Sequence, residues 1–345
     1  MRVLVTGATG FLGSHVAGRF ADRGDDVRVL VRATSDQSRL DGIPVEVALG
    51  DVTGRDSVVA AVDGCDLVVH CAAMVEFGPR DPSRLQAVNV QGARNVLDAA
   101  AAEGIRTVHV SSLSALGPTE PGEPPKDESW WFPGPLGAVY EETKREAHLH
   151  ARELIEGGAP IRIVMPGGIY GYGDRSTMAD LIRAYALWPL PLGYLPEIRQ
   201  STVDVDDCAD AIVRVADDDR DGEEYVVSAE TTSVADWVTI IARAGGHRGP
   251  VVNLPARWVT ALGGPGGKVA GWLGQSPTMV PETVAVATHD SAYRGDKLRR
   301  ELGWSPRSLA DGMQRMVDAI KADEDARRQA KRAERAARRA QRAGP

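Results

Sequence analysis

The stretch Thr6–Gly13 constrains the fold more than any other part of this sequence, because it places three glycines in one short turn. It reads Thr-Gly-Ala-Thr-Gly-Phe-Leu-Gly, follows the apolar run Val3–Val5 and opens a helical pattern. Glycines at this spacing allow a tight turn, a close approach of the backbone to a pyrophosphate and a close contact between helix and strand. The helix N-terminus then offers free N–H groups to phosphate. A glycine cluster alone indicates only a strand-to-helix turn, but in this context the stretch predicts a dinucleotide site.

Short apolar runs alternate with helical patterns through the first half of the chain. The expected strands are Val3–Thr6, Val27–Val31, Val45–Ala48, Leu67–His70 and Thr107–Val110, separated by helical stretches such as Leu12–Arg23 and Arg84–Glu103. The runs are continuously apolar and rich in valine, as expected for strands that helices cover on both faces. We therefore predict an α/β fold with a doubly wound parallel sheet of the Rossmann type.

The regular alternation weakens in the second half of the chain. The stretch Gly117–Pro135 holds too many prolines for a helix or a central strand and is expected to be a loop. After Pro166, helical patterns at Met178–Leu187, Cys208–Asp217 and Ser233–Ala244 are mixed with Pro/Gly-rich patches. The predicted domains are a dinucleotide-binding domain at 1–165, to which some later segments return, a smaller substrate lobe at 166–322 and a basic Ala/Arg-rich tail at 323–345.

Charge is distributed unevenly along the chain, whose formal net charge is −8. Residues 326–345 carry eight basic side chains against the single acidic Glu334, and no apolar stripe. We expect this segment to project as a solvated helix. The rest of the chain is acidic, so nucleic acid is expected to bind only weakly and through this tail.

Several classes of protein are excluded by what the sequence lacks. No run approaches the roughly 18–20 apolar residues that cross a bilayer, so no membrane span is expected. The chain begins with a strand pattern rather than a secretion signal, and we expect a cytoplasmic protein. Its three cysteines lack the spacing of a zinc site, and no metal is expected.

Tyr140 and Lys144 are the leading candidates for chemistry. They lie four residues apart in a helical pattern and therefore share one helix face. A phenol with a pKa near 10 is a poor acid–base catalyst at neutral pH, and a nearby cation lowers that pKa. Ser112 follows the fifth expected strand, where ligands bind in doubly wound folds, and could hold a substrate oxygen. Ser111 and Ser114 remain alternatives to Ser112.

Further motifs follow in a consistent order. They are Gly50-Asp51-Val52 after the third strand, His70-Cys71-Ala72-Ala73 after the fourth, Asn89-Val90-Gln91-Gly92 in the next helical pattern, and Pro166-Gly167-Gly168-Ile169-Tyr170-Gly171 after the apolar run Ile161–Met165. With the GxxGxxG spacing, this set resembles the extended branch of the short-chain dehydrogenase/reductase superfamily, the NAD-dependent epimerase/dehydratase family. Each motif is modest alone, whereas their conjunction is specific.

The resemblance implies roles for individual residues. Tyr140 would exchange a proton with the substrate oxygen, Ser112 would orient that oxygen, and Lys144 would lower the pKa of Tyr140 and bind the nicotinamide ribose. The expected cofactor-binding residues are Gly7, Thr9, Gly10, Phe11, Leu12, Gly13, Arg32, Asp51, Val52, Cys71, Ala72, Ala73, Asn89, Tyr140, Lys144, Pro166 and Ile169.

The end of the second strand bears on the choice of cofactor. An acidic residue there would bind the ribose 2′-hydroxyl of NAD, whereas an arginine suits a 2′-phosphate. The strand ends in Val31-Arg32, followed by Thr34 and Ser35, whose hydroxyls could also reach a phosphate. This favours NADP(H), with NAD as the alternative if Arg32 is only a solvated charge at the strand end.

Apolar side chains near the inferred site suggest a bulky apolar ligand, although such clusters are more often core. They are Met74, Val75, Phe77, Trp130, Trp131, Phe132, Trp188, Leu190, Leu192 and Tyr194. Sugar-nucleotide members of the family commonly carry Asn where Met165 stands here. The sequence is thus most similar to the dihydroflavonol-reductase-like, 3β-hydroxysteroid-dehydrogenase-like and hopanoid-associated-epimerase-like subgroup.

These observations lead to an NADP(H)-dependent oxidoreductase that reduces a carbonyl or oxidises a secondary alcohol on a hydrophobic small molecule. One alternative is an NDP-sugar epimerase or dehydratase, which reduces its cofactor only transiently. Another is a non-catalytic dinucleotide-binding sensor or scaffold, which the intact Ser112, Tyr140 and Lys144 argue against. Because the family often dimerises, a homodimer is one expected assembly.

Overall fold

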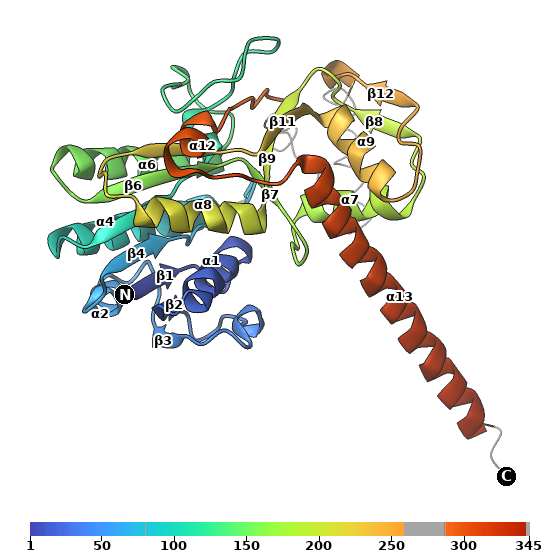
Figure 1. Cartoon of the computed structure of the whole chain (residues 1–345), viewed down its shortest axis with the longest axis horizontal. Coiled ribbons are helices and arrows are strands. Elements are labelled where there is room, and N and C mark those ends of the chain that lie inside the picture. Colours follow the sequence, from blue (N-terminus) through green and yellow to red (C-terminus); the bar gives the residue numbers. More distant parts are fainter. Residues whose placement is uncertain (80, 259–285, 287, 343–345) are drawn as a thin grey trace.

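A seven-stranded parallel sheet forms the centre of the molecule (Figure 1). The computed structural model describes residues 1–79, 81–258, 286 and 288–342. The strand order is β10-β6-β5-β4-β1-β2-β3. The strands are β1 Arg2–Thr6, β2 Asp26–Val31, β3 Glu46–Leu49, β4 Leu67–His70, β5 Arg106–Val110, β6 Ile161–Pro166 and β10 Glu224–Val227. The predicted parallel sheet is confirmed.

Helices cover both faces of this sheet, because alternate residues of each strand point to opposite sides. Val3 and Val5 pack towards α1 and α8, whereas Leu4 packs towards α2 and α4. The helix α6 continues the second layer beside α4. Their bounds are α1 Phe11–Asp22, α2 Arg55–Val62, α4 Gly92–Ala102, α6 Val139–Glu156 and α8 Val205–Asp217. Apart from the exposed edge strand β3, the sheet is therefore buried on both sides, as its valine-rich strands predicted.

The strand order reverses between β1 and β4, and this topology positions a ligand site. The register pairs Val5 with Val69 and Thr6 with His70, so both strands end at the same level. In open α/β sheets, ligands bind beyond the carboxyl ends of the strands at such a reversal. The glycine turn after β1 and the loop after β4 meet there.

Several short elements join the main ones. They are η1, a 3-10 turn at Ser38–Leu40, α3 Ser83–Leu85, η2, a π-helical turn at Gln86–Gln91, α5 Leu113–Leu116 and α12 Asp296–Leu302. The single helix expected over Arg84–Glu103 is thus interrupted by a π-helical turn that carries Asn89. Such turns are rare in proteins, and those that do occur are frequently found at functional sites.

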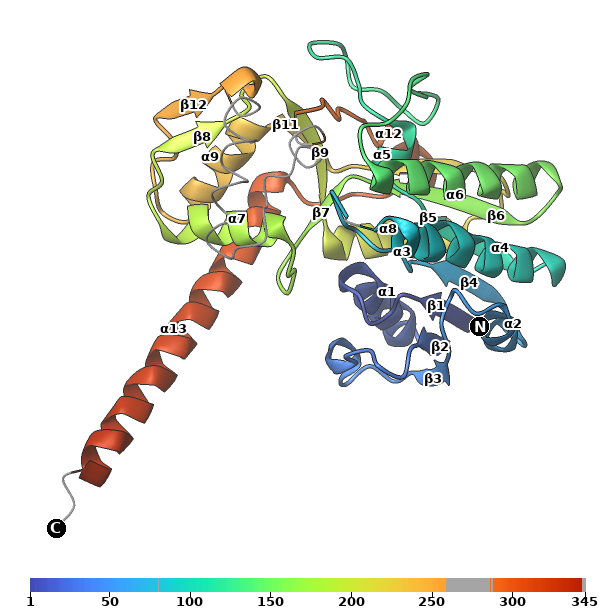
Figure 2. The ribbon, with the colours of Figure 1, turned by 180° about the vertical axis from the view of Figure 1, so that it is seen from behind.

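A smaller unit lies beyond one end of the main sheet (Figure 2). One small sheet has the order β11-β9-β7, and a second pairs β12 with β8. Its strands are β7 Gly168–Tyr170, β8 Leu192–Tyr194, β9 Arg199–Asp204, β11 Glu230–Ser233 and β12 Val252–Leu254, and its helices include α7 Thr177–Leu187 and α9 Val234–Ala244. The strand β10, from residues between β9 and β11, instead returns to the edge of the main sheet.

The last helix, α13 Leu309–Arg342, has two parts with different surroundings. Leu309, Met313, Met316, Val317 and Ile320 are buried against α7 and α9. Residues 326–334 are exposed, and Figure 1 shows the helix running away from the body. The basic segment expected from residue 323 is therefore the continuation of a helix that begins in the core of the smaller unit. None of the described helices carries an apolar stretch long enough to cross a bilayer.

Candidate active site

The turn between β1 and α1 forms a cradle of bare backbone. Gly7 has a φ of +73°, and a Cβ built on it would lie 2.7 Å from the Cα of Ala72. A Cβ on Gly13 would collide with the carbonyl oxygen of Gly7. Gly10 is the N-cap of α1, which therefore receives no side-chain cap. The first N–H groups of α1 are thus left for a ligand, and the cradle fits the pyrophosphate of a dinucleotide.

The neighbouring loops supply the other predicted cofactor positions. Cys71, Ala72 and Ala73 follow β4, and the amide of Ala72 donates a 3.4 Å hydrogen bond to Thr6 Oγ1. Asp51 and Val52 follow β3, where the Asn95 side chain holds the Val52 carbonyl at 2.9 Å. Thr9 and Leu12 lie in the glycine turn and the first turn of α1, and the Phe11 ring lies close to Gly171 after β7. The structure thus brings these positions together at one edge of the sheet.

Pro166 and Ile169 lie in the segment that runs from β6 into β7. Pro166 ends β6, and Ile169 lies in β7 and packs on the main core. A Cβ on the intervening Gly167 would lie 3.4 Å from Leu113 Cδ1. The turn between β6 and β7 therefore borders the residue that follows Ser112.

Asn89 lies beneath the site rather than on its surface. It is 2% exposed, and its amide oxygen accepts the Met74 backbone N–H at 2.7 Å. Its amide nitrogen donates to the Met74 carbonyl at 2.9 Å and to Thr143 Oγ1 at 3.0 Å. This geometry fits a residue that holds the loop after β4 against α6.

Tyr140, Lys144 and Ser112 meet at the carboxyl end of β5. Tyr140 and Lys144 lie one turn apart near the start of α6 and are 9% and 4% exposed. The Tyr140 side chain is hydrogen-bonded to that of Ser112, and Lys144 Nζ donates a 3.0 Å hydrogen bond to the Val110 carbonyl. The structure therefore brings the three predicted catalytic groups into one cluster.

Burial determines the protonation of this cluster. It raises the pKa of Tyr140 to about 12, although the hydrogen bond from Ser112 works in the opposite direction. Burial also lowers the pKa of Lys144 to about 8. Lys144 is predicted to lower the pKa of Tyr140, but desolvation is the largest effect on this phenol and moves its pKa in the other direction. Tyr140 is thus a protonated phenol at neutral pH, the form that can donate a proton to a substrate oxygen.

The neighbouring serines Ser111 and Ser112 have different hydrogen-bond partners. Ser111 is 5% exposed and its hydroxyl is bonded to His148 Nδ1 at 2.8 Å. Ser112 is partly exposed, and its oxygen accepts the Ser114 backbone N–H at 3.1 Å as the N-cap of α5. Ser112 is therefore the serine whose hydroxyl lies beside Tyr140.

Comparison with known proteins shows which family the chain resembles. The model of the NAD dependent epimerase/dehydratase family matches residues 3–228. The chain belongs to this family. Its membership, together with the reductases and dehydrogenases among its relatives, makes the chain an NAD(P)-dependent oxidoreductase.

Three curated family members illustrate the similarity. Sterol demethylase protein B of Methylococcus capsulatus is 31% identical, over 76% of this chain and 80% of that protein. A putative dihydroflavonol 4-reductase of Synechocystis is 28% identical over 92% of each chain. The 3 beta-hydroxysteroid dehydrogenase/Delta 5-->4-isomerase of Mycobacterium tuberculosis is 30% identical, over 88% of this chain and 86% of that protein.

Solved structures support the same fold. The crystal structure of gox2253 is 29% identical with a TM-score of 0.79, covering 93% of this chain and 98% of that one. The UDP-glucose 4-epimerase of Thermus thermophilus, solved with NAD, is 23% identical with a TM-score of 0.70, over 93% and 99% of the two chains. The second likeness concerns the fold alone.

Two arginines lie in the segment that follows β2. Arg32 is exposed after β2, and its Nε donates to Ser35 Oγ at 3.3 Å. Arg39 lies over the Phe11 ring at 5.6 Å and donates to the Gly173 carbonyl at 2.6 Å. The sequence did not single out Arg39, because its contacts depend on the approach of the segment after β7. A second basic residue in the loop after β2 was the available signal.

The apolar wall expected around the substrate is only partly present. The Phe77 ring packs edge-on against Tyr140 with centroids 5.5 Å apart. Trp130 and Trp131 instead pack on the core beside α6, where the Trp130 Nε1 donates to the Pro118 carbonyl at 3.1 Å. Leu190 and Tyr194 pack in the core of the smaller unit, whereas Trp188 is 61% exposed. For Trp130 and Trp131, the structure thus favours the alternative of a core position, since packing, not proximity in sequence, decides which aromatic rings reach a site.

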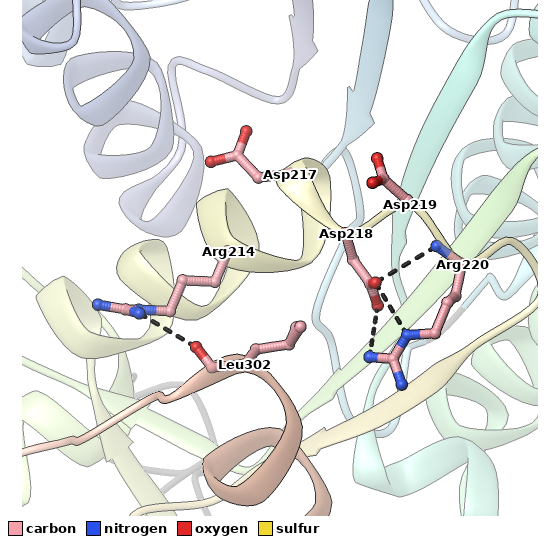
Figure 3. A pocket seen from close by; sticks show the side chains of 6 residues that line it. All are labelled: Arg214, Asp217, Asp218, Asp219, Arg220 and Leu302. Carbon is pink, nitrogen blue, oxygen red and sulfur yellow. Dashed lines mark hydrogen bonds and ion pairs between the residues drawn. The ribbon is translucent and has the colours of Figure 1, made fainter.

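A charged surface hollow lies where α8 ends (Figure 3). It is lined by Arg214, Asp217, Asp218, Asp219, Arg220 and Leu302. Its main cation, Arg220, is already bound by both oxygens of Asp218 at 3.0 Å. This hollow contains none of the predicted site residues.

Proposed function

We propose that this family member is an NADP(H)-dependent oxidoreductase that reduces a carbonyl, or oxidises a secondary alcohol, on a hydrophobic small molecule. The observation that carries the proposal is the buried, protonated Tyr140 hydrogen-bonded to Ser112 at the carboxyl end of β5. Reduction of a carbonyl needs a hydride as well as a proton, and the glycine cradle after β1 fits a cofactor that supplies the hydride.

In this mechanism, the bound nicotinamide supplies the hydride chemistry, and the residues of the chain control the proton. Tyr140 donates its phenolic proton to the substrate oxygen during reduction and takes it back during oxidation. Ser112 bonds the same oxygen and stabilises the charge that develops on it. The Lys144 ammonium lies one helical turn away and would bind the nicotinamide ribose.

Arg32 supports the choice of NADP(H). Its guanidinium is exposed beside the Ser35 hydroxyl at the end of β2, where a cofactor ribose lies in this type of fold. A planar guanidinium can bind a 2′-phosphate with two charge-assisted hydrogen bonds. The backbone of the glycine turn would hold the pyrophosphate.

The substrate class is inferred from the surroundings of Tyr140 and from the relatives. Phe77 gives Tyr140 an aromatic neighbour, and the similar proteins include a putative dihydroflavonol 4-reductase and a 3 beta-hydroxysteroid dehydrogenase. A flat, largely apolar ring system with one ketone or secondary hydroxyl fits both observations.

The test combines a substrate panel with Tyr140→Phe. The probes are a dihydroflavonol and a 3-ketosteroid with NADPH, and a 3β-hydroxysteroid with NADP⁺. We expect net consumption of the cofactor, a kcat about 10²–10⁴-fold lower in the variant, and nearly unchanged NADPH affinity, because the ring remains. Turnover without net cofactor change would favour an epimerase. A variant that keeps more than about a tenth of wild-type kcat would show that Tyr140 is not the acid.

A further inference from the structure

One buried side-chain network next to the catalytic cluster has no role in the proton transfer described above. His148 lies on α6, one turn after Lys144 and two turns after Tyr140, and is fully buried. Residues spaced by four share one face of a helix. This face of α6 therefore presents Tyr140, Lys144 and His148 in a row to the end of β5.

The three side chains contact three consecutive residues. Tyr140 is hydrogen-bonded to Ser112, Lys144 donates to the Val110 carbonyl at 3.0 Å, and His148 Nδ1 lies 2.8 Å from Ser111 Oγ. Each turn of α6 thus holds one residue of the segment 110–112. The contact of His148 is the one furthest from solvent.

The surroundings of His148 Nε2 indicate which ring nitrogen carries the proton. His148 Nε2 lies 3.4 Å from a carboxylate oxygen of Glu224 in β10, and Arg152 binds both oxygens of Glu224 at 2.6 and 2.7 Å. A carboxylate facing Nε2 favours the proton on that nitrogen, which leaves Nδ1 to accept the Ser111 hydroxyl. Burial lowers the pKa of His148, so that the neutral ring is the stable form. The Trp131 ring lies beside the His148 ring, with the two ring centroids 5.6 Å apart.

We infer that His148 is a positioning residue, which anchors Ser111 and thereby holds the turn carrying Ser112 in place against Tyr140. The inference rests on the proposed function of Ser112 and Tyr140. Without an acceptor for the Ser111 hydroxyl, the segment 110–112 loses one of its three attachments to α6. A shift of Ser112 by even about 1 Å can reduce turnover by about 10²-fold.

Two conservative variants distinguish the contributions of the two ring nitrogens of His148, because each variant replaces only one of them. In His148→Asn, the amide oxygen can take the place of Nδ1 and accept the Ser111 hydroxyl. In His148→Gln, the amide reaches the position of Nε2 and faces Glu224 instead. We expect Asn to retain most of the kcat, and His148→Gln, His148→Leu and Ser111→Ala each to lose at least about tenfold in kcat, with KM for NADPH unchanged.

A double-mutant cycle and a control variant test the mechanism. If Ser111 mediates the effect, His148→Leu combined with Ser111→Ala loses no more kcat than either change alone. The control is Leu154→Ala, six residues beyond His148 on α6, which removes packing against the same core. It is expected to lower the melting temperature and leave kcat unchanged.

Amide hydrogen exchange of the peptide 110–116, measured without cofactor, gives a readout independent of turnover. Exchange should rise in the Leu, Gln and Ser111→Ala variants and stay at the wild-type level in Asn and in Leu154→Ala. Unchanged exchange, or an Asn variant as impaired as Leu, would overturn the inference. Failure of the wild type to turn over any probe would refute the proposed function instead, while the exchange data would still decide whether His148 holds this turn.

Discussion

Tyr140 and Lys144 carry the chemistry of the site, and burial changes both of them. It moves the pKa of the phenol up to about 12 and that of the ammonium down to about 8. Both shifts favour the neutral form, as desolvation requires. The sequence predicts a cation that activates a phenol, whereas burial in the folded protein keeps the proton on that phenol.

Arg32 provides the residue-level test of cofactor choice. We expect Arg32→Ala to weaken NADPH binding by roughly 10–150-fold, which corresponds to a charge-assisted contact of about 1.5–3 kcal/mol, and to leave NADH binding nearly unchanged. Fluorescence titration with both cofactors measures this. The exposed Arg248 lies in the loop after α9, so Arg248→Ala serves as a control that should alter neither affinity. Equal losses for the two cofactors would show that Arg32 does not select NADP(H) and would favour NAD as the cofactor.

His109 supplies a prediction about pH. It is 1% exposed on β5, and its ring nitrogens have no hydrogen-bond partner among the described residues. Burial lowers the pKa of His109 in the folded protein, so below about pH 6.5 the unfolded chain binds a proton that the folded chain does not. Stability therefore falls on acidification, by about 1.4 kcal/mol per pH unit from this residue.

The variant His109→Leu should remove that contribution. Its melting temperature, compared with that of the wild type, should rise steadily as the pH is lowered from about 7 to about 5. Differential scanning fluorimetry across this range measures the difference. A difference that does not change with pH would mean that folding leaves the pKa of His109 unchanged.

At the scale of secondary-structure elements, the β1–α1 unit and α6 each place a local pattern where the fold can use it. In the first unit, three glycines let α1 pack directly on the turn that leaves β1. In α6, a spacing of four residues directs a row of side chains to the end of β5. Both arrangements follow from element geometry alone, since glycine removes a Cβ and the helical period is 3.6 residues.

Gly13→Ala tests the close approach of α1. Its added methyl would collide with the Gly7 carbonyl oxygen, so α1 must shift away from the turn. We expect a loss of about 1–3 kcal/mol in unfolding free energy and weaker binding of the dinucleotide.

The matched control lies in the same helix. A Cβ on Gly18 would meet Ile43 Cδ1 at an ordinary 3.7 Å, so Gly18→Ala should be neutral or stabilising by about 0.5–1 kcal/mol. Thermal unfolding and cofactor titration of both variants decide the matter. Similar behaviour of the two would contradict the proposed cradle.

At the scale of the whole molecule, α13 links the core of the smaller unit to a solvated basic extension. Its first turns bury Leu309, Met313 and Ile320 against α7 and α9, whereas residues 326–334 are exposed. The same helix therefore has a part that the fold requires and a part that it does not.

Removal of residues 326–345 should leave the melting temperature, cofactor affinity and turnover unchanged, because no buried side chain among the described residues is lost. The truncated protein should lose a weak retention on heparin that salt abolishes, since the removed cations release counterions. A truncation from residue 309 should in contrast unfold the smaller unit. A fall of several degrees in melting temperature for the shorter truncation would show that the extension packs on the body.

The sequence by itself determined the parts of this protein that depend on local pattern. The first five strands, the glycine cradle after β1 and the pairing of Tyr140 with Lys144 could all be predicted, because apolar periodicity, glycine spacing and the helical repeat act over a few residues. The family's motifs added the expected order of these elements.

Only the tertiary structure decided the features that depend on contacts between distant residues. It turned Ser111 towards His148 and left Ser112 for Tyr140, packed Trp131 beside α6 and brought β10 back to the main sheet. It also determined the protonation of Tyr140, because the pKa of a group depends on how far the folded chain removes it from water. Neither burial nor the partner of a side chain is encoded in spacing along the chain, since both arise when separate elements pack together.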